Sequence, residues 1–141
     1  MQIQGIPAGG FKTVGQLVGT NDLCFQIDQN AEEIAAELLS THTSGAPVID
    51  ATGKLVGFIS EIDVLRAYES KKDLSKLTAE EIMTRQPVVV HESTPIAEAV
   101  KIMRENHWLN LPVEKDGMVK YSVTRHDLLR AYTGLGLGPD R

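Results

Sequence analysis

The stretch Gly57-Phe58-Ile59-Ser60-Glu61-Ile62-Asp63-Val64-Leu65-Arg66-Ala67-Tyr68 returns 64 positions later as Tyr121-Ser122-Val123-Thr124-Arg125-His126-Asp127-Leu128-Leu129-Arg130-Ala131-Tyr132. A proline–valine pair precedes each copy, at Pro47-Val48 and at Pro112-Val113. The repeated unit is roughly 65 residues long, which is the size of one small structural repeat. The duplication predicts two similar halves that pack on each other, with any site between the halves or repeated in each.

The local patterns predict the same order of elements in both copies. The order is a short helical turn, a strand, a long helix, two strands joined by a hairpin, and a closing helix. Apolar residues on a 3.6-residue period predict the long helices, which begin near Ala31 and Ile96. Asn30 with Glu33 is typical of a capping box, and Thr94 before Pro95 is typical of an N-cap. The expected ranges of the other elements are 13–18, 23–27, 47–49, 55–59 and 61–69 in the first copy and 78–83, 87–91, 112–113, 118–123 and 125–132 in the second.

Composition excludes several classes of function. The net charge of −5 over 141 residues disfavours a nucleic-acid partner. There is no apolar run of the ~20 residues that cross a bilayer and no secretory signal, so we expect no membrane association. The single cysteine, Cys24, favours a cytoplasmic location. Catalytic and metal-ligand patterns are absent from the sequence, so we expect neither an enzyme nor a metal site.

These motifs, in this order and in duplicate, resemble the cystathionine-β-synthase-type (CBS) domain, which usually occurs in tandem pairs. The resemblance rests on the Pro-Val strands, the two strand-to-helix joints and Glu80-Glu81-Ile82-Met83-Thr84. It implies an α/β fold: a tandem CBS-domain pair of two pseudo-twofold-related β-α-β-β-α units with packed small sheets. The expected division is an N-terminal arm (1–12), CBS domain 1 (13–70), a linker (71–77), CBS domain 2 (78–132) and a flexible tail (133–141).

The resemblance also implies a function, that of a Bateman module. Such modules bind adenine nucleotides or related adenosyl compounds (AMP, ADP, ATP, NAD or S-adenosylmethionine) in clefts between the repeats. They often form homodimers and regulate an enzyme or transporter without catalysis of their own, and they require no cofactor. We therefore expect a sensor that signals to a separate, unidentified partner protein. The alternative is a dimerisation or interaction module that binds no nucleotide.

The strand-to-helix joints carry the expected ligand contacts. Thr124 is predicted to be the N-cap residue of the last helix and Asp127 its third residue, where backbone N–H groups attract phosphate. By resemblance, Thr124 falls on the family's phosphate position and Asp127 on its ribose position, as do Ser60 and Asp63 in the first copy. The same spacing is also that of a capping box, and both roles can hold at once.

The two joints differ in charge. Arg125 and His126 favour a phosphate in the second cleft, whereas Glu61 at the place of Arg125 favours a less charged adenosyl ligand, or none, in the first. Tyr121 stands where Gly57 stands in the first copy, which narrows the second cleft or offers a ring for stacking. Trp108 is expected in the core or in a dimer interface, with stacking on a base as the alternative. By resemblance, the base lies against Thr84, Pro87, Val88, Leu109, Asn110, Leu111 and Pro112 in the second copy and Thr20, Gly45 and Ala46 in the first.

Overall fold

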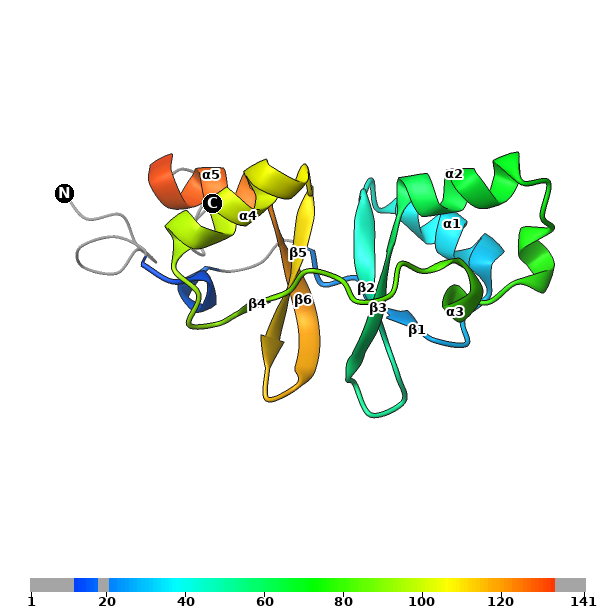
Figure 1. Cartoon of the computed structure of the whole chain (residues 1–141), viewed down its shortest axis with the longest axis horizontal. Helices are drawn as coiled ribbons and strands as arrows, with labels where there is room; N and C mark the ends of the chain where they lie inside the picture. Colours follow the sequence, from blue (N-terminus) through cyan, green and yellow to red (C-terminus); the bar gives the residue numbers. More distant parts are fainter. Residues whose placement is uncertain (1–11, 18–20, 134–141) are drawn as a thin grey trace.

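The two repeats fold into two similar halves that lie side by side (Figure 1). The structure is a computed structural model, and it describes residues 12–17 and 21–133. The elements up to the first closing helix are η1 (Val14–Gln16), β1 (Phe25–Gln26), α1 (Ala31–Ser40), β2 (Gly45–Ile49), β3 (Leu55–Ser60) and α2 (Glu61–Glu69). Those that follow are η2 (Leu74–Lys76), α3 (Ala79–Ile82), β4 (Val90–His91), α4 (Ile96–Asn106), β5 (Asn110–Lys115), β6 (Met118–Thr124) and α5 (Arg125–Thr133).

Each half contains one three-stranded sheet with the same topology. The orders are β1-β2-β3 and β4-β5-β6, with the first pair of strands parallel and the second pair antiparallel in both. Val48 pairs with Gly57 in the first sheet, and Val113 pairs with Tyr121 in the second, so the registers correspond. The predicted α/β fold of two packed repeats with small sheets is confirmed. The N-terminal arm and the tail fall almost wholly outside the described residues.

The two parallel strands, β1 and β4, are shorter than the sequence predicts. The reason is that the segment in front of each strand crosses to the sheet of the other repeat. Asn21 forms a bridge with Ser122 of β6, and Thr84 forms one with Phe58 of β3. Each crossing segment therefore pairs with the opposite half just ahead of the predicted strand.

The hydrophobic cores follow the same exchange. Val14 and Leu17, at the start of the first repeat, lie in the core of the second repeat, whereas Ala79 and Met83 lie in the core of the first. Each half thus depends on apolar residues that the other repeat supplies. The largest fully buried apolar side chains are Phe25, Ile34, Val48 and Ile59 in one core and Val14, Val90, Leu111 and Val123 in the other.

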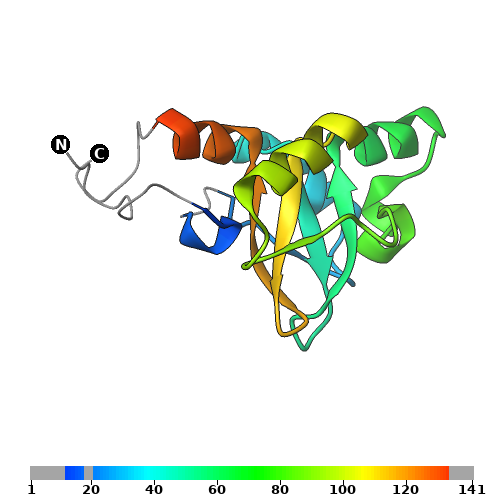
Figure 2. The same cartoon turned by 60° about the vertical axis from the view of Figure 1, so that its left-hand side comes forward.

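All four long helices lie along one edge of the molecule, and the hairpin turns lie at the opposite edge (Figures 1 and 2). The helices α1, α2, α4 and α5 pack on the sheets through their apolar sides. None of the helices in the described ranges has the length and hydropathy that crossing a membrane requires.

The predicted start of α1 is confirmed and that of α4 is shifted by one residue. The Asn30 Oδ1 accepts hydrogen bonds from the N–H groups of Glu32 and Glu33, at 3.0 and 3.3 Å. In contrast, Pro95 occupies the N-cap position of α4, and the Thr94 hydroxyl oxygen accepts a hydrogen bond from the His91 N–H at 2.9 Å. Pro95 suits the position where the chain enters the helix, because the φ of proline is fixed. Thr94 instead orders the turn that precedes the helix.

Replacement of Asn30 by alanine is expected to destabilise the protein by about 1 kcal/mol, because two N–H groups at the start of α1 lose their acceptor. Urea unfolding followed by circular dichroism measures the change. Asn30→Asp keeps the acceptor and should lose less stability than Asn30→Ala. Equal losses in the two variants would contradict the capping role.

Candidate ligand-binding clefts

Two clefts lie between the repeats, and both are built in the same way. Each combines the strand-to-helix joint of one repeat with the loop between the long helix and the next strand of the other. Cleft 1 has a volume of about 610 Å³ and cleft 2 of about 640 Å³, which is within the range of small-molecule sites. Cleft 1 is lined by Ser44, Phe58, Ser60, Glu61, Ile62, Asp63, Leu65, Arg66, Thr84 and residues 106–110. Cleft 2 is lined by Asn21, residues 41–44, Leu109, Asn110, Thr124, Arg125, His126 and Leu129.

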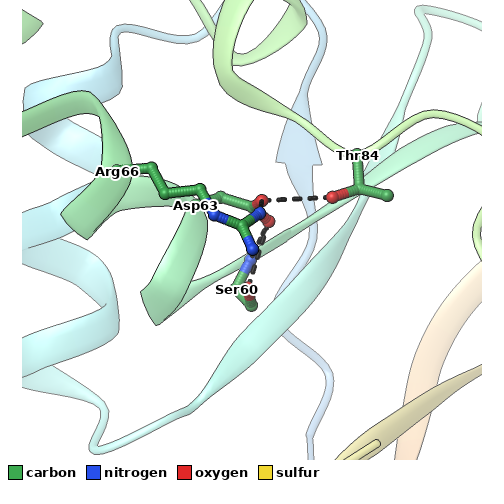
Figure 3. A network of polar contacts seen from close by, with 4 residues as sticks. All are labelled: Ser60, Asp63, Arg66 and Thr84. Carbon is green, nitrogen blue, oxygen red and sulfur yellow. Dashed lines mark hydrogen bonds and ion pairs between the residues drawn. The ribbon is translucent and has the colours of Figure 1, made fainter. Parts of the chain in front are cut away.

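Asp63 is the central polar residue of cleft 1 (Figure 3). Its Oδ2 accepts hydrogen bonds from the Ser60 backbone N–H at 2.9 Å and from the Ser60 hydroxyl at 3.1 Å. Its Oδ1 accepts a hydrogen bond from the Thr84 hydroxyl at 3.1 Å and lies 3.7 Å from the Arg66 Nη1. The carboxylate is only 6% exposed, whereas Arg66 is 70% exposed. One oxygen therefore caps α2, and the other faces groups that a ligand can displace.

Gly57 explains why Thr84 reaches this carboxylate. A Cβ atom built on Gly57 would lie 2.4 Å from the Met83 Sδ and 2.9 Å from the Thr84 carbonyl oxygen. The absence of a side chain lets the backbones of Phe58 and Thr84 exchange two hydrogen bonds, of 2.9 and 2.8 Å. The close approach holds the Thr84 hydroxyl over Asp63.

Two aromatic rings form the apolar wall of cleft 1. Phe58 and Trp108 pack edge to face, with ring centroids 6.0 Å apart and an interplanar angle of 76°. Trp108 is partly buried and lines the cleft, so it does not lie inside a core. Because it comes from the loop before β5, it reaches the site of the other repeat. Phe58 was not predicted as a site residue, and the sequence carries no signal that pairs it with Trp108, because the two lie in different repeats at positions that are not equivalent.

Cleft 2 has a different character, because the aspartate of its joint does not line it. The Thr124 N–H donates to the Asp127 Oδ2 at 2.9 Å, and the Asp127 N–H donates to the Thr124 Oγ1 at 3.1 Å. This is a capping box, and the one at Ser60 and Asp63 matches it. Asp127 is only 1% exposed and is not among the residues that line the cleft, whereas Thr124, Arg125 and His126 are.

Tyr121 is a second difference between the two joints. It takes the position of Gly57 and packs against the second core. Burial, together with the negative charges of Glu92 and Asp127, raises the pKa of the Tyr121 phenol, so the ring lies in the electrostatic field of the Asp127 carboxylate. The segment that crosses from the first repeat pairs with β6 at Ser122. The Ser122 N–H donates a hydrogen bond to the Asn21 carbonyl oxygen at 2.8 Å.

A buried polar network joins the clefts. The Asn21 Nδ2 donates to the Gly45 carbonyl at 2.9 Å and to the Asn110 Oδ1 at 3.3 Å. The Asn110 Nδ2 donates to the Ser44 Oγ at 2.6 Å. Ser44 and Asn110 line both clefts, so the two clefts share these side chains.

The remaining predicted residues fall into three groups. Thr84 lies in cleft 1 and not beside Thr124 as expected, because its segment crosses to the first repeat. Leu109 and Asn110 line both clefts, and Thr20 lies outside the described residues. The lining of neither cleft includes the strand residues Gly45, Ala46, Leu111 and Pro112, which are buried, or Pro87 and Val88, which are partly buried.

The charges of the two clefts are opposite in sign. Cleft 1 presents the carboxylates of Glu61 and Asp63, with Arg66 at its rim. Cleft 2 presents Arg125 and two histidines, His42 and His126, but no carboxylate. Within residues 12–17 and 21–133, no group of three or more His, Cys, Asp or Glu side chains is placed to hold a metal ion.

Two α/β repeats, exchanged at their leading segments and enclosing two clefts, define a paired-repeat binding module. The CBS domain family model matches residues 14–70 and 79–134, and the chain belongs to this family. The CBS domain-containing protein CBSX1 (chloroplastic) of Arabidopsis thaliana is 31% identical, over 96% of the chain and 70% of its own length. The chain spans 19% to 29% of three further curated relatives.

Solved structures agree with this assignment. CBSX2 in complex with AMP superposes with a TM-score of 0.76 at 26% identity, covering 90% of the chain and 100% of CBSX2. The CBS domain pair of protein MJ0100, in complex with 5'-methylthioadenosine and S-adenosyl-L-methionine, superposes with a TM-score of 0.74 at 28% identity, covering 86% and 96% of the two chains. The predicted resemblance to a tandem CBS pair is confirmed.

Proposed function

We propose that the protein is a regulatory module that binds an adenosine-containing ligand and performs no catalysis itself. The observation that carries the proposal is the composition of cleft 1, where a buried carboxylate faces an aromatic wall. The adenosyl ligands of two similar CBS pairs support the same class of ligand.

Cleft 1 suits a nucleoside. The rings of Phe58 and Trp108 offer an apolar surface for a purine base. The Asp63 Oδ1 accepts hydrogen bonds from the ribose, whose hydroxyls displace the Thr84 hydroxyl, while Oδ2 stays on the cap of α2. The ion pair between Asp63 and the exposed Arg66 opposes ribose binding only weakly, because a surface ion pair of 3.7 Å contributes less than about 1 kcal/mol. Glu61 disfavours phosphates here, so we assign a weakly charged adenosyl group to cleft 1.

Cleft 2 suits an anion. Thr124 and the N-terminus of α5 offer hydrogen-bond donors, and Arg125 supplies a permanent positive charge. Cations at a helix N-terminus oppose the helix dipole, and a bound phosphate compensates for them. We therefore assign phosphate-bearing ligands such as AMP to cleft 2. Asp127 is 1% exposed and does not line cleft 2, so we assign a carboxylate contact with a ribose to cleft 1 and Asp63 alone.

Signalling follows from the shared network. A ligand in either cleft contacts Ser44 and Asn110 at the junction of the repeats, and it changes how the repeats pack. A separate partner protein that binds one packing more tightly than the other would respond to the ligand. The coupling free energy between ligand binding and partner binding would be about 1–3 kcal/mol.

A thermal-shift panel of adenosine, AMP, ADP, ATP, NAD and S-adenosylmethionine tests the proposal. A ligand at 100 times its Kd is expected to stabilise the protein by about 2.7 kcal/mol, which raises the melting temperature by several degrees. Guanosine and GMP serve as controls for the base. If no adenosyl compound shifts the melting temperature at millimolar concentration, the proposal fails.

The second candidate function is an interaction module that binds no nucleotide. The capping boxes favour it, because they already engage both aspartates with the protein's own groups. A flat thermal-shift panel together with stable self-association would support this alternative.

A further inference from the structure

The two clefts meet at a junction where they share three side chains, two of them polar. Ser44, Leu109 and Asn110 line both clefts. Ser44 comes from the loop between α1 and β2 of the first repeat, and Asn110 begins β5 of the second. The Asn110 Nδ2 donates a hydrogen bond to the Ser44 Oγ at 2.6 Å, so the polar pair spans the seam between the repeats.

The hydrogen bonds of the junction leave few protons for a ligand. Asn21 donates both of its side-chain N–H groups to the protein, one to the Gly45 carbonyl oxygen and one to the Asn110 Oδ1. The Asn110 amide keeps one N–H, because its other N–H is on Ser44. The Ser44 hydroxyl keeps its single proton, for which the described residues supply no acceptor. Each of the two shared side chains can therefore donate one hydrogen bond to one ligand.

The repeat does not provide a second set of these donors. Leu109 is the counterpart of Ser44, and its side chain has no donor. Gly45 is the counterpart of Asn110, since the two pair with equivalent residues of the next strand. A Cβ atom built on Gly45 would lie 2.7 Å from the Phe58 Cε1, so an asparagine does not fit there. Two clefts of about 610 and 640 Å³ are thus served by one serine and one asparagine.

We propose that Ser44 and Asn110 couple the two clefts with negative cooperativity. The inference rests on the proposed function, because it requires a weakly charged adenosyl ligand in cleft 1 and a phosphate-bearing one in cleft 2. The ligand that binds first accepts the Ser44 proton, and the second ligand lacks that hydrogen bond. Loss of one neutral hydrogen bond lowers an affinity by about fivefold. By linkage, each ligand weakens the binding of the other by the same factor.

Trp108 reports on cleft 1 by itself. It is the only tryptophan of the chain, and it lines cleft 1 but not cleft 2. Adenosine is titrated against Trp108 fluorescence at increasing concentrations of ATP, because Glu61 disfavours the phosphates of ATP in cleft 1. The apparent dissociation constant of adenosine is expected to rise and then level at about five times its value without ATP. Direct competition for one cleft would instead raise it without limit.

Ser44→Ala removes the shared hydroxyl and frees the second Asn110 N–H, so that each cleft can have a donor of its own. The plateau should fall below about twofold, while adenosine alone should bind this variant more weakly. Thr43→Ala is the matched control, because it removes the hydroxyl of the neighbouring residue, which lines cleft 2 but not cleft 1. This variant should keep the plateau of the wild type. Circular dichroism confirms the fold of both variants.

The coupling is overturned by ATP that binds without changing the adenosine titration, by an apparent dissociation constant that rises without a plateau, or by equal plateaus in Ser44→Ala and Thr43→Ala. Separate titrations with adenosine and with ATP show whether each ligand binds alone. Failure of either ligand to bind would contradict the assignment of its cleft under the proposed function, and the coupling with it. Independent binding of both ligands would contradict the coupling only.

Discussion

Replacement of Asp63 by asparagine is expected to weaken binding of an adenosyl ligand to cleft 1 by about 100-fold. Hydrogen bonds to a charged group contribute about 1.5–3 kcal/mol each, and the neutral amide loses the charge and puts an NH2 group in place of Oδ1, the acceptor that faces the ribose. The amide oxygen of asparagine still accepts from the Ser60 N–H, so the cap of α2 is largely preserved. Isothermal titration calorimetry with the ligand identified in the thermal-shift panel measures the change.

The repeat provides a matched control for this variant. Asp127→Asn makes the same substitution at the same position of α5, where the carboxylate also accepts from the N-cap N–H. Both variants weaken a capping box, but only Asp63 borders its cleft. We expect Asp127→Asn to retain cleft 1 affinity within about threefold, since it removes no ligand contact there. An equal loss in both variants would show that the caps, and not a ribose contact, control binding.

The repeat in the sequence was sufficient to predict the fold. Two copies of one apolar pattern place the helices α1 and α4, the two hairpins and the closing helices α2 and α5 close to where the structure has them. The pattern works because each element buries one face, and burial leaves a period in the sequence. The crossing of each leading segment to the other repeat leaves no such period in the sequence. Val14 and Ala79 are apolar in either core, so the sequence does not state which core receives them.

The site was predictable in part for the same reason. Ser60 and Asp63 lie within one joint, Thr124 and Arg125 lie within the other, and the spacing in each is local to a helix start. Thr84 and Trp108 reach cleft 1 from distant segments, and neither was predicted for it. Which of the two aspartates, Asp63 or Asp127, lines a cleft also depends on long-range contacts. The sequence shows aspartate at 63 and at 127, but only packing shows that Gly57 brings Thr84 onto the first and that the second does not line its cleft.

The contact at Gly57 yields the largest expected effect on stability. Gly57→Val should lower the free energy of unfolding by about 3 kcal/mol or more, because overpacking costs about 1–3 kcal/mol and the hydrogen bonds between Phe58 and Thr84 are weakened as well. For a chain of this length, the melting temperature falls by about 10 °C. Differential scanning calorimetry measures both quantities.

The equivalent position in the second repeat separates crowding from the general effect of a β-branched residue. Tyr121→Val puts the same side chain where the structure already accommodates a larger one, and it should cost no more than about 2 kcal/mol. Because Gly57→Val also moves the Thr84 hydroxyl away from Asp63, it is expected to reduce adenosyl binding at 20 °C, where the variant is folded. A Gly57→Val protein as stable as Tyr121→Val would mean that the two backbones do not approach as closely as the structure places them. The order of the two variants therefore tests the contact on which the shape of cleft 1 depends.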